Sequence, residues 1–276
     1  MKKKLLFVID SLGCGGAEKS LVSLLPLLNR DKYEIHLWML YRGGALESLL
    51  PPYIIVEDNP PYNYGERLKK KMAQIRYSIT YRLKIIIGKR EHRAETLWKS
   101  TGWAFKAPQD NYDVAVAYQQ GFPTYLVATK IKARKKNAWI NADIFKAGYN
   151  PSYNARFYNQ FDTIVPVSGE LETILKKNYS QYKEKYFCVY DIINPALIKI
   201  QATADISDEE LFEKDVTLVT TGRLASPKNY PLAVETAKIL KDKGLDFKWL
   251  FIGEGEERSR IEKLITKYHL EAQVIL

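Results

Sequence analysis

The chain has 276 residues, of which 46% are hydrophobic and 27% are charged, a composition typical of a globular protein with one or two domains. Its formal net charge of +10 favours an anionic partner: a phosphate-bearing ligand, a membrane surface or nucleic acid. No apolar run approaches the roughly 18 residues of a membrane span. The distant cysteines Cys14 and Cys188 argue against a disulfide framework and favour a reducing compartment.

The N-terminal residues predict a βαβ unit. The apolar run Leu5–Asp10 is too short for a signal peptide and indicates a strand, and a Gly-rich loop follows at 13–16. A helix is expected over 17–29, because leucines recur on one face. Strands are expected at 33–40 and 54–56. A Gly-rich turn therefore opens the first helix.

Residues 60–110 form a basic helical insert. Between residues 66 and 106 the sequence has twelve Lys or Arg and three Asp or Glu. Apolar residues recur at helical spacing: Leu68, Met72, Ile75, Ile79, Leu83 and Ile86. One interpretation is in-plane docking on an anionic membrane. The other, which we favour slightly because such a stripe has to pack against something, is a helix whose apolar side is buried on the sheet.

Alternating strands and helices resume after the insert. Strands are predicted at 114–118, 138–141, 163–167 and 185–189, and helices at 123–132 and 170–178. The segment 148–152 is rich in Gly, Pro and Asn and indicates a loop. The polar stretch 201–214 is the predicted linker. The first domain is therefore assigned to residues 1–200.

The last sixty residues predict half of a second α/β domain. Apolar runs at 216–221 and 247–252, and a third from Gln273, alternate with two helical segments. This βαβαβ order is the first half of a doubly wound domain, assigned to 215–276. In the usual strand order the remaining strands pair beside the run at 216–221, so that edge is expected to be unpaired.

Two loops contain candidate anion-binding groups. Gly15 and Gly16 open a helix, where free amides and the helix dipole favour a phosphate; the alternative is a tight turn without a ligand. Arg223 and Lys228 follow the strand at 216–221, where open α/β sheets bind ligands, and together they can neutralise a diphosphate. The alternative for this pair is two solvated loop cations.

Other candidates are weaker. Gly253 and Gly255 follow the next strand and would let the backbone approach a nucleotide. Asn141 and Asp143 follow the strand at 138–141, where they could hold a sugar hydroxyl or orient a nucleophile; the alternative is an Asx turn. The three histidines are not grouped, and we interpret them as structural or surface residues.

These residues together resemble the retaining GT-B glycosyltransferases, specifically the family called glycosyltransferase group 1 or family four. In the first half the resemblance rests on a strand followed by GGAE at 15–18, and on the pairs Phe161-Asp162 and Val167-Ser168. The second half contributes an ordered set that is more specific than any single Gly loop: Gly222-Arg223-Leu224, Lys228-Asn229 and FIGEGEER at 251–258.

The resemblance implies a reaction and roles for residues. Family members transfer a sugar from a nucleotide-sugar with retention, and they need no metal or other cofactor because protein cations stabilise the leaving diphosphate. Arg223 and Lys228 match those cations, and Gly15 and Gly16 match the loop whose amides meet the phosphates. Asn141 stands where many members have His; Asn does not titrate near neutrality, so it can offer only hydrogen bonds.

The implied fold is α/β of the GT-B type, an N-terminal Rossmann-like domain followed by half of a second one. Family members continue through more strands and a motif of two glutamates eight positions apart. We therefore expect weak or no transferase activity unless a second chain completes the C-terminal domain.

The expected function is transfer of a hexose to a glycan or lipid-linked acceptor in cell-surface polysaccharide synthesis. The expected location is the cytoplasm, peripheral on the inner face of the membrane. The alternative is a non-catalytic binding or partner protein derived from such an enzyme. A nucleic-acid partner is not expected, because no RNP-like or helix-turn-helix pattern accompanies the basic charge.

Overall fold

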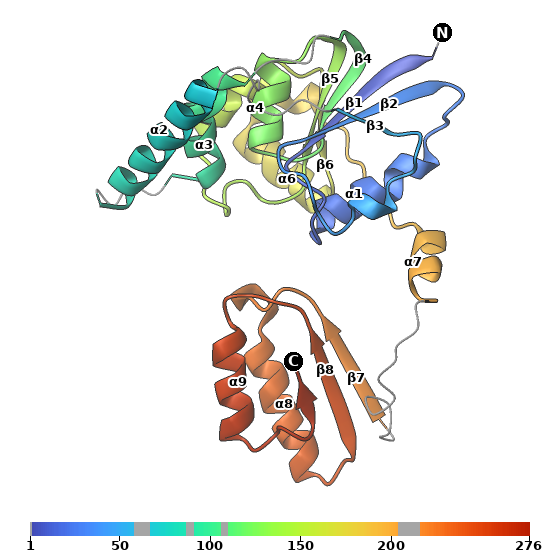
Figure 1. The fold of residues 1–276 in the computed structure, drawn as a ribbon, viewed down its shortest axis with the longest axis vertical. Helices are drawn as coiled ribbons and strands as arrows, with labels where there is room; N and C mark the ends of the chain where they lie inside the picture. The colour runs from blue at the N-terminus through green and yellow to red at the C-terminus, as the bar shows by residue number, and fades with distance from the viewer. Residues whose placement is uncertain (1, 58–66, 87–90, 106–109, 204–215) are drawn as a thin grey trace. The chain divides into compact units, whose positions relative to one another are not determined.

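The chain divides into two compact units, Met1–Lys199 and Ile200–Leu276, each with its own parallel sheet (Figure 1). The computed structural model describes residues 2–57, 67–86, 91–105, 110–203 and 216–276, with side chains given from residue 71 onward in the second range. Most of the predicted linker at 201–214, and the parts of the basic insert at 60–66, 87–90 and 106–109, lie outside the described residues.

The first unit is built on a six-stranded parallel sheet with the order β3-β2-β1-β4-β5-β6. Its strands are β1 Lys3–Ile9, β2 Tyr33–Met39, β3 Ile55–Val56, β4 Tyr112–Ala117, β5 Ala133–Ile140 and β6 Thr163–Pro166. The helices before the second unit are α1 Gly16–Leu24, α2 Arg67–Ile86, α3 Arg93–Thr101, α4 Phe122–Thr129, α5 Pro151–Tyr158, α6 Gly169–Asn178 and α7 Pro195–Gln201. The predicted α/β class is confirmed.

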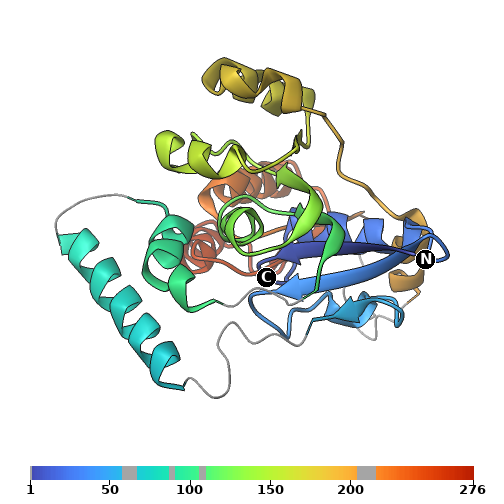
Figure 2. The same ribbon diagram turned by 90° about the horizontal axis from the view of Figure 1, so that it is seen from above.

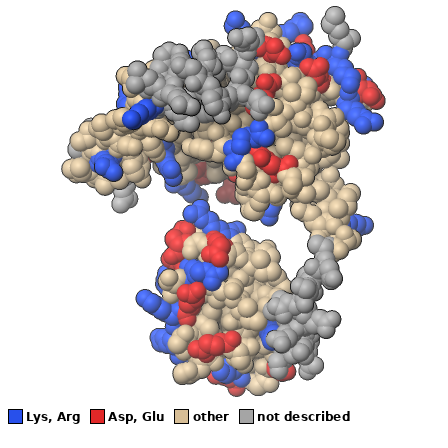
Figure 3. All heavy atoms as spheres, viewed as in Figure 1, with Lys and Arg blue, Asp and Glu red and all other residues tan. Residues whose placement is uncertain are grey.

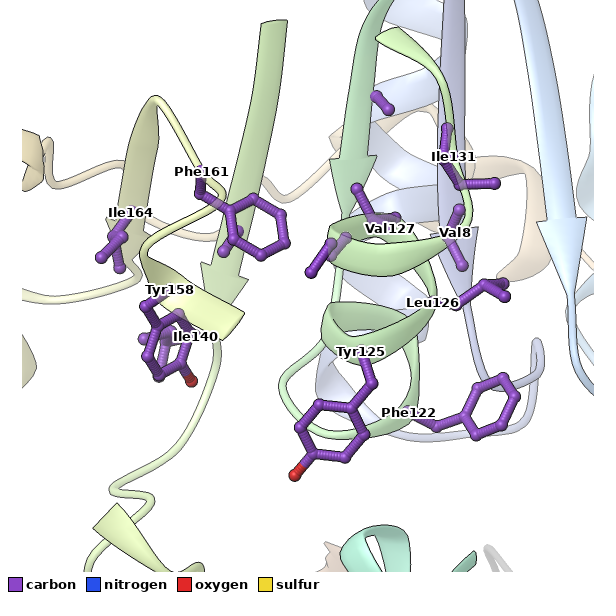
Figure 4. Packing of buried hydrophobic residues seen from close by; sticks show 14 of the residues in the cluster. Val8, Phe122, Tyr125, Leu126, Val127, Ile131, Ile140, Tyr158, Phe161 and Ile164 are labelled. Atoms are coloured by element: carbon purple, nitrogen blue, oxygen red, sulfur yellow. The ribbon is translucent and has the colours of Figure 1, made fainter. Parts of the chain in front are cut away.

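Helices cover both faces of this sheet, which explains why β1 is apolar on both sides from Leu5 to Ile9. Alternate residues of β1 enter different clusters: Leu6 and Val8 join one, while Leu5, Phe7 and Ile9 join the other. Figure 4 shows the first cluster, with Val8 beside aromatic and aliphatic residues of α4. The carboxyl ends of β1, β4 and β5 therefore meet at one edge of a rigid sheet.

The predicted strand at 185–189 is wrong. Residues Ser180–Lys185 form a 3-10 helix, and Tyr186 makes only an isolated bridge with Ile164. The tyrosines of this segment explain the difference, because their hydroxyls donate to backbone carbonyls of α5 and of the end of α6 instead of lying along the sheet. The segment runs beside β6 without extending the sheet as a regular strand.

The long basic helix α2 exposes its apolar side. Its inner side packs on α3 and includes the buried Ala73. Two hydrogen bonds join the helices: the Tyr77 hydroxyl accepts from Arg93 Nε at 3.2 Å, and Lys84 Nζ donates to Thr96 Oγ1 at 3.3 Å. Both ribbon views show α2 beside α3 and away from the sheet (Figures 1 and 2).

The apolar stripe of α2 is at least half exposed at nearly every described position, from 49% at Leu83 to 79% at Ile86. The expectation that this stripe is buried on the sheet is therefore wrong: small and polar side chains make the contact with α3 instead. No helix among the described residues is long and apolar enough to cross a membrane.

The second unit has a three-stranded parallel sheet with the order β7-β8-β9. Its strands are β7 Val216–Thr221, β8 Phe247–Ile252 and β9 Val274–Ile275, and its helices are α8 Tyr230–Asp242 and α9 Arg258–Lys267. One core joins the helices to one side of the sheet, through Val234, Phe247 and Ile261 among others. Within the described residues β7 pairs with β8 alone, so its other edge has the unpaired position expected from the sequence.

Glu95 fixes the insert to the rest of the first unit. This buried carboxylate of α3 accepts hydrogen bonds from the Asn150 amide and from Asn154 Nδ2, each at 2.7 Å. Both donors belong to the start of α5, so one side chain joins two helices. Removing it takes the side-chain acceptor away from the Asn150 amide and from one N–H of the buried Asn154, whose Nδ2 also donates to the Asn150 carbonyl.

We expect Glu95→Ala to lower the free energy of unfolding of the first unit by about 1–3 kcal/mol, because the Asn150 amide and the buried Asn154 side chain lose this acceptor. Urea denaturation followed by far-UV circular dichroism measures the change. Exposed Glu184 is the matched control, and Glu184→Ala should stay within about 0.5 kcal/mol of wild type. Equal midpoints for the two variants would contradict this role of Glu95.

Candidate functional site

The loops after β7 and β8 are joined backbone to backbone at the carboxyl edge of the second sheet. The Gly222 amide donates to the Ile252 carbonyl, the Leu224 amide to Glu254 and the Glu257 amide to Leu224, at 2.9–3.0 Å. Parallel sheets of this kind bind ligands at this edge. The three bonds hold the loop that carries both candidate cations in one conformation.

Arg223 and Lys228 are both exposed on this loop. Arg223 Nη2 forms an ion pair with Glu256 Oε2 at 3.2 Å, and both side chains are more than half exposed. The carboxylate's own backbone amide, with a smaller contribution from Arg223, lowers the pKa of Glu256. The Lys228 stem lies beside Gly222, where an added Cβ would be 3.8 Å from its Cε. An anion competing for Arg223 would have to replace an exposed, weak ion pair.

Gly253 and Gly255 have a structural explanation. A Cβ on Gly253 would lie 1.9 Å from the Gly222 carbonyl oxygen, and a Cβ on Gly255 would lie 2.2 Å from that of Leu224. These glycines therefore allow the two loops to touch. Their predicted contact with a nucleotide stays a prediction.

In the first unit the Gly-rich turn precedes α1 as expected. Gly15 is the N-cap and provides no side-chain cap, and a Cβ on Gly16 would meet no atom within 4 Å. The helix start is thus open at Gly16. Glu18, however, folds over Gly15, where an added Cβ would be 2.3 Å from its Oε2. A phosphate here would face that carboxylate, so the predicted role of the loop in donor binding requires Glu18 to turn away.

Asn141 and Asp143 follow β5 as predicted, but their side chains are held differently. Asp143 Oδ1 accepts from the Phe145 and Lys146 amides at 2.9 and 3.1 Å, which is the Asx turn expected as its alternative. Asn141 Nδ2 donates to the Tyr118 carbonyl at 2.8 Å, and its Oδ1 is buried with no donor among the described residues. The catalytic roles of both residues stay predictions.

The sequence analysis missed Asp10, which directly follows β1. Its backbone amide donates to Gln119 Oε1 at 3.3 Å, while its own Oδ1 is buried and has no donor in the described part of the chain. Burial, and secondarily the charge of Glu18, raise the pKa of Asp10 to about 7. An acidic residue closing an otherwise apolar strand was the available signal.

Aromatic side chains lie near Asp10. Tyr149 is buried and stacks on His92 with ring centroids 3.6 Å apart. Burial raises the pKa of Tyr149, and the charge of Asp10 adds to the effect, which places the two groups near each other. Tyr41 is half exposed. Its pKa is raised by partial burial and, to a smaller extent, by the charge of Asp10, while Arg93 acts in the opposite direction. Burial lowers the pKa of His92, whose Nδ1 accepts from the Ala94 amide.

Comparison of the sequence with known proteins gives a family and a relative. The model of the family described as glycosyl transferases group 1 matches residues 202–276. The chain is 27% identical over 280 residues to a Campylobacter jejuni protein, N-acetylgalactosamine-N,N'-diacetylbacillosaminyl-diphospho-undecaprenol 4-alpha-N-acetylgalactosaminyltransferase. That match covers 99% of this chain and 69% of the relative. These findings favour the enzyme over the non-catalytic binding protein.

Solved structures show the same fold at lower identity. Anabaena HepE in complex with UDP and glucose has a TM-score of 0.58 and is 16% identical, over 99% of this chain and 68% of that one. A mutant of Staphylococcus aureus TarM, in a complex that includes UDP, has a TM-score of 0.55 and is 11% identical, over 99% of this chain and 77% of that one. The likeness shows a fold of the GT-B type, and the three-stranded second sheet fits half of the second domain of that fold.

We expect Gly255→Ala to lower the free energy of unfolding of the second unit by about 1–3 kcal/mol, because the new Cβ overlaps the Leu224 carbonyl. Hydrogen exchange of peptides from β7 and β8, read by mass spectrometry, measures the effect. Gly16→Ala is the matched control, since its Cβ meets open space. Wild-type exchange rates in Gly255→Ala would show that the two loops are not in backbone contact.

Proposed function

We propose that this chain, a glycosyltransferase with a group 1 domain and the GT-B fold, transfers a hexose from a nucleotide-sugar to a lipid-linked glycan with retention. The observation that carries the proposal is the pair of exposed cations, Arg223 and Lys228. They share one fixed loop at the carboxyl edge of the second sheet, inside the segment that matches the family.

The two cations would stabilise the leaving group. When the bond between the anomeric carbon and the phosphate oxygen breaks, its electron pair stays on the nucleoside diphosphate. The planar guanidinium of Arg223 can bind two phosphate oxygens, and Lys228 adds a mobile point charge. Such donors are most effective when they are already placed where charge develops. The backbone bonds between the loops after β7 and β8 provide that placement.

Retention follows from where the proton of the acceptor hydroxyl goes. Asn141 does not titrate near neutrality, and Asp143 Oδ1 already accepts two backbone amides. The departing phosphate oxygen is itself a base, on the face of the sugar that the leaving group occupied. If it takes the proton, the acceptor oxygen bonds the anomeric carbon on that same face.

A lipid-linked acceptor is supported by the relative and by α2. The name of the Campylobacter relative specifies a diphospho-undecaprenol acceptor. In this chain α2 exposes an apolar stripe together with Lys71, Arg76 and Arg82. The part of the surface that carries α2 shows basic groups among residues of other kinds (Figure 3). This pattern suits a helix lying in the plane of an anionic membrane. We therefore place the enzyme peripherally on the inner membrane face, in cell-surface polysaccharide synthesis.

We expect Arg223→Ala and Lys228→Ala each to weaken binding of UDP or GDP about tenfold or more, because each removes a charge-assisted bond to phosphate. Isothermal titration calorimetry with both nucleotides measures this and identifies the preferred base. Lys263→Ala, which removes an exposed cation of α9, should bind like wild type. If all three variants bind UDP and GDP with the affinity of wild type, the donor site is elsewhere.

We expect the chain to float with vesicles containing anionic lipid at low salt and to be released as salt rises. The double variant Ile75→Ser, Ile79→Ser removes apolar area from the exposed stripe and should reduce vesicle binding about tenfold. Gln74→Ser, on another exposed side of α2, is the control. If the wild-type chain does not bind anionic vesicles at low salt, the proposal that α2 lies on a membrane is wrong.

A further inference from the structure

Polar side chains follow the three central strands of the first sheet. Asp10 follows β1, Gln119 and Gln120 follow β4, and Asn141 follows β5, and these strands are neighbours. The two glutamines are already engaged, since Gln119 Oε1 accepts the Asp10 amide and Gln120 Oε1 accepts the Asn141 amide. The glutamines thus hold the backbone on either side of β4.

Two oxygen atoms in this row remain without a donor among the described residues: Oδ1 of Asp10 and Oδ1 of Asn141. Both are buried, so water does not reach them freely. A buried acceptor without a partner is unfavourable. Such groups are rare in folded proteins, and an ordered water or a bound molecule is the usual explanation. The Asn141 oxygen and the ionised Asp10 carboxylate can only accept, so a molecule bound there would supply the donors.

The surroundings suit a sugar ring. Tyr149 and His92 form a stacked pair near Asp10, and Tyr41 lies half exposed beside it. The half-exposed Tyr41 ring can pack against the C–H face of a sugar, while oxygen acceptors bind its hydroxyls. Gly121 leaves room for the Tyr149 ring, since an added Cβ would lie 2.9 Å from the Tyr149 hydroxyl.

We propose that Asp10 is an acceptor-binding residue, whose unpaired Oδ1 accepts a hydrogen bond from a hydroxyl group of the acceptor's terminal sugar. Asn141 Oδ1 offers a second acceptor at the end of β5. The inference rests on the proposed function, because it assigns to the first unit the sugar that receives the transferred hexose. Asp10 positions that sugar and takes no part in bond breaking.

The protonation of Asp10 gives the proposal a specific signature. Its pKa is raised to about 7 by burial and by Glu18, and Tyr41 and Tyr149 are the other titratable groups near it, with Arg93 beyond Tyr41. Below this pH the carboxyl is protonated, and above it the carboxylate accepts more strongly. Acceptor affinity should therefore rise as pH passes from about 6 to about 8.

The test uses the full chain and a defined probe, farnesyl diphosphate carrying a terminal N-acetylgalactosamine, in detergent. We expect Asp10→Asn, which keeps the shape of the side chain, to weaken probe binding about tenfold at pH 8 while UDP binding is unchanged. The wild-type dissociation constant should fall from pH 6 to pH 8, and that of Asp10→Asn should stay flat. Asp31→Asn, in an exposed turn, is the control and should behave like wild type.

The outcomes separate this inference from the proposed function. Wild-type binding of UDP with no binding of the probe, or equal probe binding by wild type and Asp10→Asn, overturns the assignment of Asp10 and leaves the donor site standing. Failure of wild type to bind any nucleotide overturns the proposed function instead. Near-UV circular dichroism and unchanged UDP affinity establish that Asp10→Asn is folded.

Discussion

Backbone contact between the loops after β7 and β8 is the constraint on which the candidate donor site depends. Three amide–carbonyl bonds join these loops, and the two glycines at 253 and 255 permit the approach. The contact fixes the base of Arg223 while its guanidinium stays exposed and only weakly paired with Glu256. Such an arrangement separates two tasks: glycines set the geometry, and cations supply the charge.

The first unit shows a different balance between stability and function. Its sheet buries apolar residues on both faces, yet in the row of side chains at its carboxyl edge two oxygen acceptors have no donor in the described ranges of the chain. Next to it, α2 contacts α3 through small and polar groups and leaves its apolar stripe exposed. Both features lower the stability of the isolated chain. The proposed sites for a sugar and for a lipid surface would account for them.

Much of the fold could be predicted from the sequence, because period and turn chemistry are local. The runs beginning at Leu5 and Val216 became strands, and the glycines at 15 and 222 mark the turns that follow them. Tertiary contacts decided the rest. The sequence of 185–189 is typical of a strand, and only the packing of Tyr186 shows that it is not one. Periodicity alone could not show which side of α2 faces solvent. Asp10 was missed because one acidic residue after a strand is a weak signal without its burial.

The most direct test of the central claim is a crystal structure of the chain with UDP. The account predicts that the diphosphate lies against the loop after β7, with its oxygens within hydrogen-bond distance of Arg223 and Lys228, and that the Arg223–Glu256 ion pair is broken or shared. A diphosphate bound at another place, with that ion pair intact and Lys228 free in solvent, would contradict it.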